Sequence, residues 1–508
     1  MTGAVAAGHP LTTRAAAEMM SRGGNAFDAV VSAGFASVVA EPALTSLGGG
    51  GFLLAHIENR HEDILFDFFV DTPGLNAAND IKPFMTPVDI KFPGHTQVFH
   101  TGFASAAVPG MLKGLLHIHQ RLCTLPLKTV LSPAMSYLEK GVEISETQGM
   151  ILGLLEPVFT STEYGRSIYM KNGRYISQQD RLFNPLMKEF LRGLVNNAHD
   201  LYRNETAQGL VNSINTHHGT MTLDDLTAYR VIERKPIRIR YRDSEIITNP
   251  PPSTGGLLLA LALYLLERVD LRSMPRDSAH VLVPLVEAMK EMTSFNPLKN
   301  GAPSSYPLAG SVMAGIIESF RKNVAENTLT ATQGTTHISI IDREGNAASM
   351  TTSNGSGSGC FIPGTGIMLN NMMGEDDLHP DGFFSSPPGH RVSSMMIPAM
   401  VMKDGKVKFV LGSGGSKRIK TAVLQVLINL IDFQVPLKEA VERPRVHYED
   451  GVVQAEPGIE EKVIDGLRTL HPVNTWGLKN MYFGGVHCVN NHMEGWGDSR
   501  RGGSFLTG

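Results

Sequence analysis

The stretch GTTHISIIDREGNAASMTT, residues 334–352, decides the fold. Apolar residues alternate through HISII (337–341), a glycine-containing turn follows, and AASMTT (347–352) continues as a second alternating run. This pattern predicts a β-hairpin. Two threonines stand directly after Gly334, at the point where the first strand begins. Hydroxyl groups at the start of a buried strand call for a chemical explanation.

Thr335 has such an explanation as a nucleophile. A threonine hydroxyl needs a base, and the α-amine of the same residue can be that base if the residue begins a chain. Its reference pKa of about 7.7–8.0 leaves much of it neutral at working pH. Gly334 tolerates the strained backbone that cleavage requires, and residues 290–334 have the polar composition of an exposed linker. Self-cleavage between Gly334 and Thr335 is one interpretation of this arrangement, and a loop that simply meets a β-strand is the other.

Composition excludes several classes of protein. The chain has 508 residues, a formal net charge of -4, 42% hydrophobic and 19% charged residues, so no electrostatic case exists for nucleic acid or an anionic membrane. Cys123, Cys360 and Cys488 are too scattered for a disulfide framework or a zinc site. There is no HExxH motif or nucleotide-binding loop, and His217 with His218 is expected on the surface. We predict no metal and no cofactor.

The expected location is the cytoplasm. The first twenty residues lack the basic and apolar regions of a signal peptide. The longest apolar segment, GLLLALALYLLERV (256–269), is shorter than the roughly 20 residues that a membrane span needs. We expect it to be a buried helix.

Other segments predict the surrounding elements. Residues 11–24 and 25–42 are expected to be helices, the second with Asn25 as its N-cap. YRVIERKPIRIRYRD (229–243) is expected to be one strand with a solvated face. KVKFVLGSGGSKRIKTAVLQVLINLIDF (406–433) predicts a strand, a glycine-rich elbow and a long helix, with Ser416 as its N-cap.

Several of these motifs together resemble the γ-glutamyltransferase family of N-terminal nucleophile hydrolases. The similar segments are, in chain order, GGNAFDAVVSAGFA (23–36), LGGGGF (47–52), AVPGML (107–112), MTLDDLTAYR (221–230), PPPSTGG (250–256), TTHISIIDREGNAASMTT (335–352), PGTGIMLNNMMGEDD (363–377), HRVSSMMIPAMV (390–401) and LGSGGSKRIKTAVLQVLINLID (411–432). The resemblance spans nearly the whole chain. It implies an α+β fold, a four-layer αββα sandwich, built from a large fragment (1–334) and a small fragment (335–508).

The resemblance also implies roles for particular residues. Thr335 would attack an amide carbonyl and form an acyl-enzyme. Gly414 and Gly415 would supply backbone N–H groups for the oxyanion, which suits a glycine pair between a strand and a helix. The remaining substrate-binding candidates are Ser393 and Ser394 for the α-carboxylate, Ser353 and Asn354 near the family's Thr-x-Asn, and Glu375, or alternatively Asp376, for the α-amino group.

The chain departs from the family pattern at Phe69. The family has an arginine in a DFRE-like segment that grips the glutamyl α-carboxylate, whereas this chain reads FDFFVDTPG (66–74). An aromatic ring cannot replace the bidentate cation. The segment LHPDGFFSSPPGH (378–390) is also short, which predicts that a long lid is absent. Both features favour hydrolysis over transfer.

Three functions follow as alternatives. The first is hydrolysis of γ-glutamyl amides such as glutathione, or transfer of the acyl group. The second is an amidohydrolase or acylase of the same family acting on a different small amide. The third is a non-catalytic scaffold that never matures. The conjunction of Thr335, Gly414 and Gly415 favours an enzyme, with its own two fragments and a small amide as its only partners.

Overall fold

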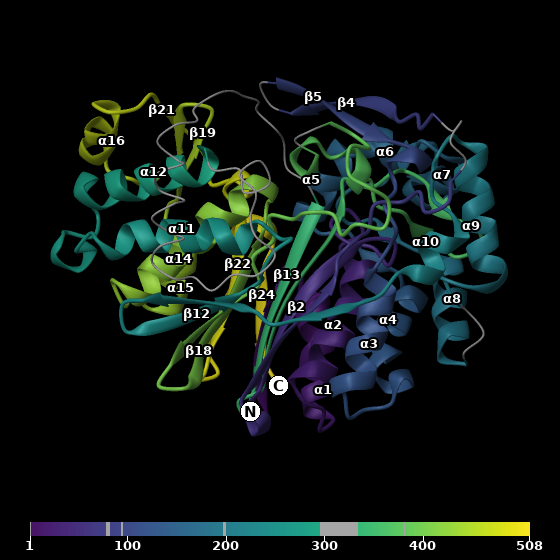
Figure 1. Cartoon of the computed structure of the whole chain (residues 1–508), viewed down its shortest axis with the longest axis horizontal. Helices are drawn as coiled ribbons and strands as arrows, with labels where there is room; N and C mark the ends of the chain where they lie inside the picture. Colours follow the sequence, from purple (N-terminus) through teal and green to yellow (C-terminus); the bar gives the residue numbers. More distant parts are fainter. Residues whose placement is uncertain (1, 78–81, 93–94, 197–199, 295–333, 380–381) are drawn as a thin grey trace.

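The computed structural model describes residues 2–77, 82–92, 95–196, 200–294, 334–379 and 382–508. The predicted linker therefore lies mostly outside the described residues, although residues 290–294 prove to be the end of a helix. Two antiparallel sheets stack face to face, and helices cover both outer faces (Figure 1). This confirms the predicted four-layer αββα sandwich.

The predicted hairpin lies near the centre of a seven-stranded sheet. Along the sheet the strands are β10 (Ile232–Arg234), β3 (Glu62–Phe68), β2 (Gly50–Ile57), β14 (Ala347–Gly355), β13 (Gly334–Asp342), β1 (Gly3–Ala7) and β24 (Ser504–Thr507). The Asp342 carboxylate accepts hydrogen bonds from the backbone N–H groups of Asn346, in the turn, and of Ala26, at a helix start. The turn is thereby tied to the neighbouring helix.

The second sheet has six antiparallel strands. They are β11 (Ile237–Tyr241), β12 (Ser244–Thr248), β17 (Ala399–Lys403), β18 (Lys406–Gly414), β22 (Gly485–Asn490) and β23 (Gly495–Gly497). The two sheets meet partly through small polar groups. Ser339 of β13 donates to the carbonyl of His487, and Ser349 of β14 donates to that of Leu411. Gly412 leaves room for the His337 ring, which a Cβ at that position would overlap.

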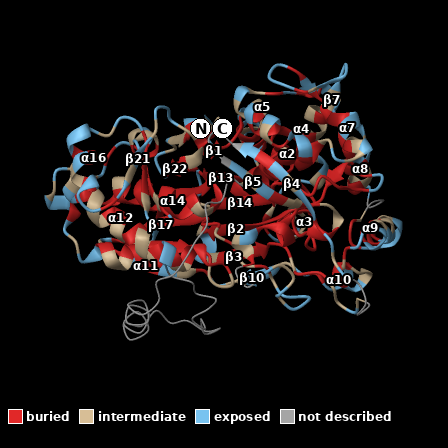
Figure 2. Ribbon diagram, turned by 90° about the horizontal axis from the view of Figure 1, so that it is seen from above, coloured by how far each residue is buried: buried red, intermediate tan, exposed pale blue. Residues whose placement is uncertain are grey.

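Each outer layer is a set of helices. The seven-stranded sheet is covered by α1 (Pro10–Ser21), α2 (Ala26–Ala40), α3 (Met111–Leu122), α4 (Leu127–Lys140) and α8 (Pro185–Val195), and the six-stranded sheet by α11 (Gly255–Glu267), α12 (Ala279–Ser294), α14 (Ile419–Ile431) and α15 (Leu437–Glu442). Two apolar cores fill the spaces between sheets and helices. Figure 2 shows these layers as buried and the outer helix faces as exposed.

Smaller elements surround the sandwich. They are the hairpin of β4 (Thr86–Phe92) and β5 (His95–Thr101), the helices α5 (Glu146–Leu154), α6 (Glu156–Phe159), α7 (Glu163–Tyr169), α9 (Asn204–Thr216), α10 (Leu223–Ala228) and α16 (Glu461–Arg468), the short strands β6 (Val142–Glu143), β7 (Met170–Lys171), β8 (Arg174–Tyr175), β9 (Arg181–Leu182), β15 (Phe361–Ile362) and β16 (Ile367–Met368), and the sheet of β19 (Val446–Glu449), β20 (Val452–Ala455) and β21 (Val473–Thr475).

Two expectations about single elements are confirmed. Asn25 caps α2 in a capping box, in which its side chain accepts from the backbone N–H of Asp28 and the Asp28 carboxylate accepts from the N–H of Asn25. The apolar segment after Gly255 forms α11, and most of its residues are buried in the core of the second layer.

The expectation of one strand over residues 229–243 is wrong. The segment forms two strands, and they belong to different sheets: β10 pairs with β3, and β11 pairs with β12. Lys235 and Pro236 lie between them. Proline has no N–H to donate to a sheet ladder, so the chain leaves the first sheet at this point and enters the second.

Candidate active site

Thr335 lies at the pocket end of β13, and only 4% of its surface is exposed. Opposite it in the ladder stands Ser353 of β14, and the register shifts between Gly334 and Thr335. Thr335 lines a pocket together with Phe69, Ser353, Gly355, Met372, Asp377, Leu378, Ser394, Met395, Met396, Ser416 and Ile419. Four predicted site residues, Phe69, Thr335, Ser353 and Ser394, therefore share one pocket.

Ser353 bridges the two groups that would react in self-cleavage. The Thr335 hydroxyl lies 3.4 Å from the Ser353 hydroxyl, within hydrogen-bond reach. The Ser353 hydroxyl also donates to the carbonyl oxygen of Gly334 and accepts from the N–H of Gly355. No side chain fits at Gly334, because a Cβ there would overlap the carbonyl oxygen of Gly355.

Gly414 and Gly415 lie close to Thr335, at positions where only glycine fits. Gly414 ends β18, and a Cβ built on it would overlap the carbonyl oxygen of Thr335. Gly415 has a φ of +127°, in the region that favours glycine. The prediction that Ser416 caps the helix is wrong. Gly415 precedes a 3₁₀ turn over Ser416–Arg418, and the Ser416 hydroxyl donates to Asp377 at 3.1 Å.

Two buried ionisable side chains, Arg501 and Glu41, lie beside Thr335 and Thr336. A guanidinium nitrogen of Arg501 lies 3.4 Å from the Thr335 carbonyl oxygen, to which it donates. Glu41 accepts hydrogen bonds of 2.7 Å from the hydroxyls of Thr336 and Thr12. Burial raises the pKa of Glu41 to about 7, against the lowering effect of these hydrogen bonds.

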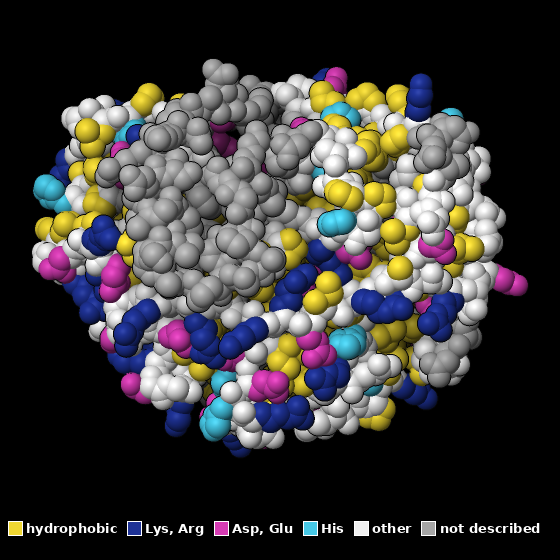
Figure 3. Space-filling view, in the orientation of Figure 1, with side chains coloured by type: hydrophobic (Ala, Val, Ile, Leu, Met, Phe, Trp, Pro, Cys, Tyr) yellow, Lys and Arg dark blue, Asp and Glu magenta, His cyan; other side chains and the backbone are white. Residues whose placement is uncertain are grey.

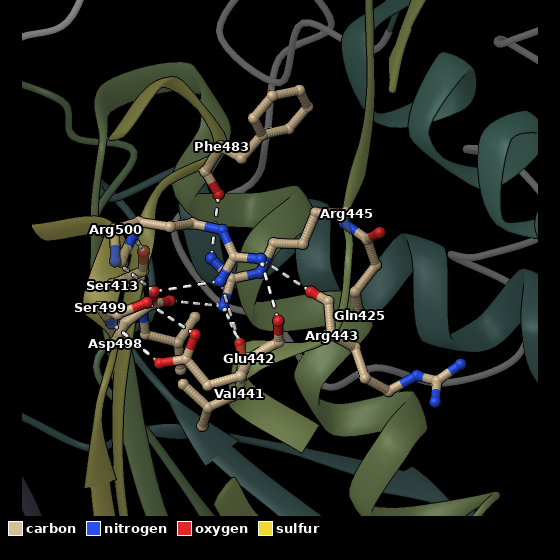
Figure 4. A network of polar contacts seen from close by, with 12 residues as sticks. Ser413, Gln425, Val441, Glu442, Arg443, Arg445, Phe483, Asp498, Ser499 and Arg500 are labelled. Atoms are coloured by element: carbon tan, nitrogen blue, oxygen red, sulfur yellow. Dashed lines mark hydrogen bonds and ion pairs between the residues drawn. The ribbon is translucent and has the colours of Figure 1, made fainter. Parts of the chain in front are cut away.

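The segment that carries Arg501 is fixed by a buried ion-pair network. Figure 4 shows Asp498 between Arg445 and Arg500, at 2.6 Å and 3.1 Å. Arg500 also pairs with Glu456 at 2.6 Å. Although burial acts in the opposite direction, Arg445 and Arg500 hold the pKa of Asp498 well below its usual range. Asp498 also accepts from the N–H of Val486, which ties this segment to β22, and Arg501 extends from it.

Phe69 forms an apolar part of the pocket. Its ring stacks on Phe52, with centroids 5.6 Å apart. The nearby buried cation Arg391 is directed elsewhere: its guanidinium pairs with Asp71 at 2.9 Å and Asp67 at 3.3 Å, and donates to the Tyr229 hydroxyl. Among the described lining residues there is no arginine.

The two serines of the HRVSS segment take different positions. Ser394 lines the pocket, and its hydroxyl accepts from the N–H of Met396 at 3.1 Å. The Ser393 hydroxyl donates to the carbonyl of Pro252 at 3.0 Å, away from the described lining. The PPPSTGG loop holds both in place, since Thr254 donates to the carbonyl of Ser394.

Three substrate-binding candidates lie outside the described pocket lining: Asn354 and Glu375 are buried, and Asp376 is exposed. The Asn354 side chain donates to the carbonyl of Leu369 at 3.4 Å, and Glu375 accepts from the hydroxyl and the N–H of Ser356 at 3.2 Å. Burial raises the pKa of Glu375 to about 8. Neither these two nor Asp376 is among the described lining residues, so their roles stay predictions.

Asp377 is the acidic residue that lines the pocket, one position beyond the two that the sequence offered. It pairs with Lys417 at 3.0 Å and accepts from Ser416. Sequence reasoning also missed Glu41 and Arg501. Glu41 did carry a signal: it is the only acidic or basic residue (Asp, Glu, Lys or Arg) between Asp28 and Glu58.

Other kinds of site find no support in the described parts of the chain. No cluster of three or more histidine, cysteine or acidic side chains is placed to hold a metal ion. On the face shown in Figure 3, basic side chains are interspersed with acidic ones. Within the same described ranges, no helix is long and apolar enough to cross a membrane.

Comparisons with known proteins identify a family for the chain. The family model described as Gamma-glutamyltranspeptidase matches residues 12–507. The chain is 32% identical over 482 residues to the Acylase ACY 1 proenzyme of Pseudomonas sp. (strain SE83), covering 92% of this chain and 86% of the relative. It is 31% identical over 474 residues to the Glutathione hydrolase proenzyme of Pseudomonas aeruginosa, covering 88% and 83%.

A solved structure shows the same fold. The cephalosporin acylase of Bacillus halodurans superposes with a TM-score of 0.83 at 22% sequence identity, and the match covers 100% of this chain and 96% of that one. The family model matches nearly the entire length, and two relatives are 32% and 31% identical to the chain over most of its length. The chain belongs to the γ-glutamyltransferase family of N-terminal nucleophile hydrolases.

Proposed function

We propose that this chain cleaves itself between Gly334 and Thr335 and then hydrolyses γ-glutamyl amides, such as glutathione, through an acyl-enzyme on Thr335. The observation that carries the proposal is the position of Ser353. Its hydroxyl donates to the carbonyl of Gly334 and lies 3.4 Å from the hydroxyl of Thr335. Electrophile and nucleophile are thereby held by one side chain.

Self-cleavage follows from this arrangement. The Thr335 oxygen adds to the carbonyl carbon of Gly334, whose oxygen gains negative charge that the Ser353 hydroxyl stabilises. The carbon–nitrogen bond breaks, the nitrogen takes the proton that the Thr335 hydroxyl has released, and Gly334 is left as an ester on the threonine. Water then hydrolyses the ester. The products are a carboxyl group on Gly334 and a free amine on Thr335.

Turnover repeats this chemistry on a substrate. The free amine accepts the hydroxyl proton as the oxygen attacks the substrate amide, and the leaving amine takes that proton. N–H groups at Gly414 and Gly415 are the proposed oxyanion donors, which the close approach of Gly414 to Thr335 supports. Water finally releases the acyl group as a carboxylic acid.

An acylase that acts on a different small amide is the second candidate. Phe69, Met372, Leu378, Met396 and Ile419 make much of the pocket apolar. The α-carboxylate of a glutamyl group would lack the arginine that pairs with it elsewhere in the family. This favours an acyl group without that carboxylate. One relative is named an acylase and another a glutathione hydrolase, so both candidate functions have a precedent among the relatives.

A denaturing gel tests maturation. Purified wild-type protein should give two fragments, the smaller starting Thr-Thr-His by Edman sequencing, whereas Thr335→Ala should stay intact. A single wild-type band after long incubation would contradict self-cleavage and favour the scaffold.

Three chromogenic anilides then separate the substrate classes. γ-Glutamyl, glutaryl (without the α-amino group) and 4-aminobutyryl (without the α-carboxylate) p-nitroanilides are compared on the matured enzyme. A preference for γ-glutamyl supports glutathione-like substrates. A preference for either of the other two supports the acylase.

A further inference from the structure

Arg501 follows a path that three glycines leave open. Its side chain passes Gly485, where a Cβ would lie within 2.6–2.9 Å of the arginine's aliphatic carbons. Its guanidinium then reaches the glycine pair, with nitrogens 3.3 Å and 3.5 Å from where Cβ atoms of Gly414 and Gly415 would stand. The absence of side chains at Gly414, Gly415 and Gly485 thus leaves the space that the Arg501 side chain occupies.

The guanidinium is buried with few partners. Arg501 is 2% exposed, and its contact with Thr335 is a hydrogen bond of 3.4 Å. Two of its nitrogens, Nε and the second terminal nitrogen, have no hydrogen-bond partner among the described residues. A buried cation without a close counter-ion is costly, which points to a role beyond packing.

We propose that Arg501 is a positioning residue for the nucleophile: it holds the main-chain carbonyl of Thr335, and its positive charge keeps the α-amine of Thr335 unprotonated after cleavage. The inference rests on the proposed function, because that amine exists only once the Gly334–Thr335 bond is broken. In the same residue, the carbonyl that Arg501 contacts and the future amine are separated by one Cα atom.

Electrostatics explain why the charge matters. A like charge within about 4–6 Å disfavours protonation of an amine and shifts its pKa by about one unit or more. The reference pKa of an α-amine is about 7.7–8.0. A nearby guanidinium lowers this pKa, so most of the amine is neutral, and therefore basic, near pH 7. A neutral amine is the form that accepts the hydroxyl proton.

The other charged groups near Arg501 are committed elsewhere. Arg418 adds positive charge from the α14 side, and buried His487 has a pKa lowered by burial to about 4, so it is neutral at working pH. Asp498 is paired with Arg445 and Arg500. Glu41 is bonded to two threonines, and with a pKa of about 7 it is only partly ionised there. Asp377, which lines the same pocket as Thr335, is paired with Lys417 at 3.0 Å. Among the described residues, no carboxylate is therefore ion-paired with the Arg501 guanidinium beside Thr335.

Titration of the amine itself tests the proposal without any substrate. Matured protein is treated with formaldehyde and cyanoborohydride across pH 5–10, and mass spectrometry follows methylation of the Thr335 amine, which reacts only when neutral. In Arg501→Gln, which keeps a hydrogen-bond donor without the charge, the midpoint should rise by about one pH unit. In Arg501→Lys it should stay at the wild-type value.

Two controls separate the possible outcomes. Arg443→Gln removes the same charge at the end of α15, outside the described pocket lining, and should leave the midpoint unchanged. If the wild-type protein does not cleave itself, the proposed function is contradicted, whereas the inference about Arg501 concerns only the cleaved protein.

If folded Arg501→Gln fails to cleave while Arg501→Lys cleaves, the charge acts on the precursor, before the amine exists, and the proposal that it acts on the amine is overturned. An unchanged midpoint in Arg501→Gln, a midpoint raised equally in Arg501→Lys, or two folded variants that both fail to cleave would overturn it.

Discussion

The floor and the walls of the pocket differ in composition and in origin. The floor, defined as the lining residues Thr335 and Ser353 together with the residues that contact them from behind, Gly334, Gly414 and Arg501, consists of strand ends, glycines and one buried cation. The walls, defined as Phe69, Met372, Leu378, Met396 and Ile419, are apolar. Hydrogen bonds fix the floor, whereas side-chain packing shapes the walls.

This difference separates the chemistry from the choice of substrate. In the proposed mechanism the floor contains the bond to be cut, the nucleophile and the groups that polarise the carbonyl, so it would act on every amide that reaches it. The walls decide which acyl group is stable in the pocket. We therefore expect floor substitutions to affect all substrates alike and wall substitutions to change the ratio between substrates.

Gly414→Ala should have the largest effect. The added methyl group would overlap the carbonyl oxygen of Thr335, and a displacement of about 1 Å at a reacting group costs on the order of 10²-fold in rate. We expect kcat/KM to fall by at least that factor for all three anilides. Gly477→Ala, a position with no atom within 4 Å of the new Cβ, should retain full activity. If kcat/KM fell for only one of the three anilides, the floor would also select the substrate, which contradicts the distinction between floor and walls.

Ser353→Ala should slow maturation by about 10²-fold, the typical effect of removing one donor to a developing oxyanion. A time course of precursor on denaturing gels measures it. Ser353→Thr keeps the hydroxyl and should restore cleavage. Ser358→Ala removes a buried hydroxyl of the same segment that donates to Leu369 and should cleave normally. Cleavage of Ser353→Ala at the wild-type rate would remove Ser353 from the mechanism.

Phe69→Arg should raise γ-glutamyl turnover about tenfold relative to 4-aminobutyryl turnover. A hydrogen bond to a charged group contributes about 1.5–3 kcal/mol, part of which is lost to burial of the new cation. Phe69→Leu creates space without charge and should not raise the ratio. If Phe69→Arg leaves the ratio unchanged, this wall does not face the α-carboxylate.

Glu41→Gln should have the smallest effect, one on stability that depends on pH. The folded-state pKa of about 7 exceeds the usual 4.5, so the folded protein retains a proton that the unfolded chain releases. Wild-type stability therefore declines as pH rises from about 4.5 to 7, and the glutamine variant lacks this decline.

Between pH 5 and pH 8 the free energy of unfolding of Glu41→Gln, relative to wild type, should increase by about 2 kcal/mol. Urea denaturation at both pH values measures it. The exposed Glu344 supplies the control, since Glu344→Gln should show no such change. An equal difference at both pH values would mean that Glu41 does not retain its proton.

The sequence predicted what local patterns encode. The hairpin over 334–352, the capped helix after Asn25 and the elbow at Gly414 all depend on neighbouring residues. The split of residues 229–243 between two sheets depends on partners that are distant in sequence. The orientation of Asn354 and Glu375 depends on how the chain turns after β14 ends. Arg501 lies 166 residues from Thr335, and no local pattern connects them.

The two ends of the chain lie side by side (Figure 1), with the N–H of Thr2 donating to the carbonyl of Gly508 at 2.6 Å. Because β1 pairs with both β13 and β24, a short linker can join these ends without disturbing the sheet. A circular permutant could then be translated from Thr335 onward. Removal of its initiating methionine would expose the threonine amine directly, so the catalyst would form without ever passing through a precursor.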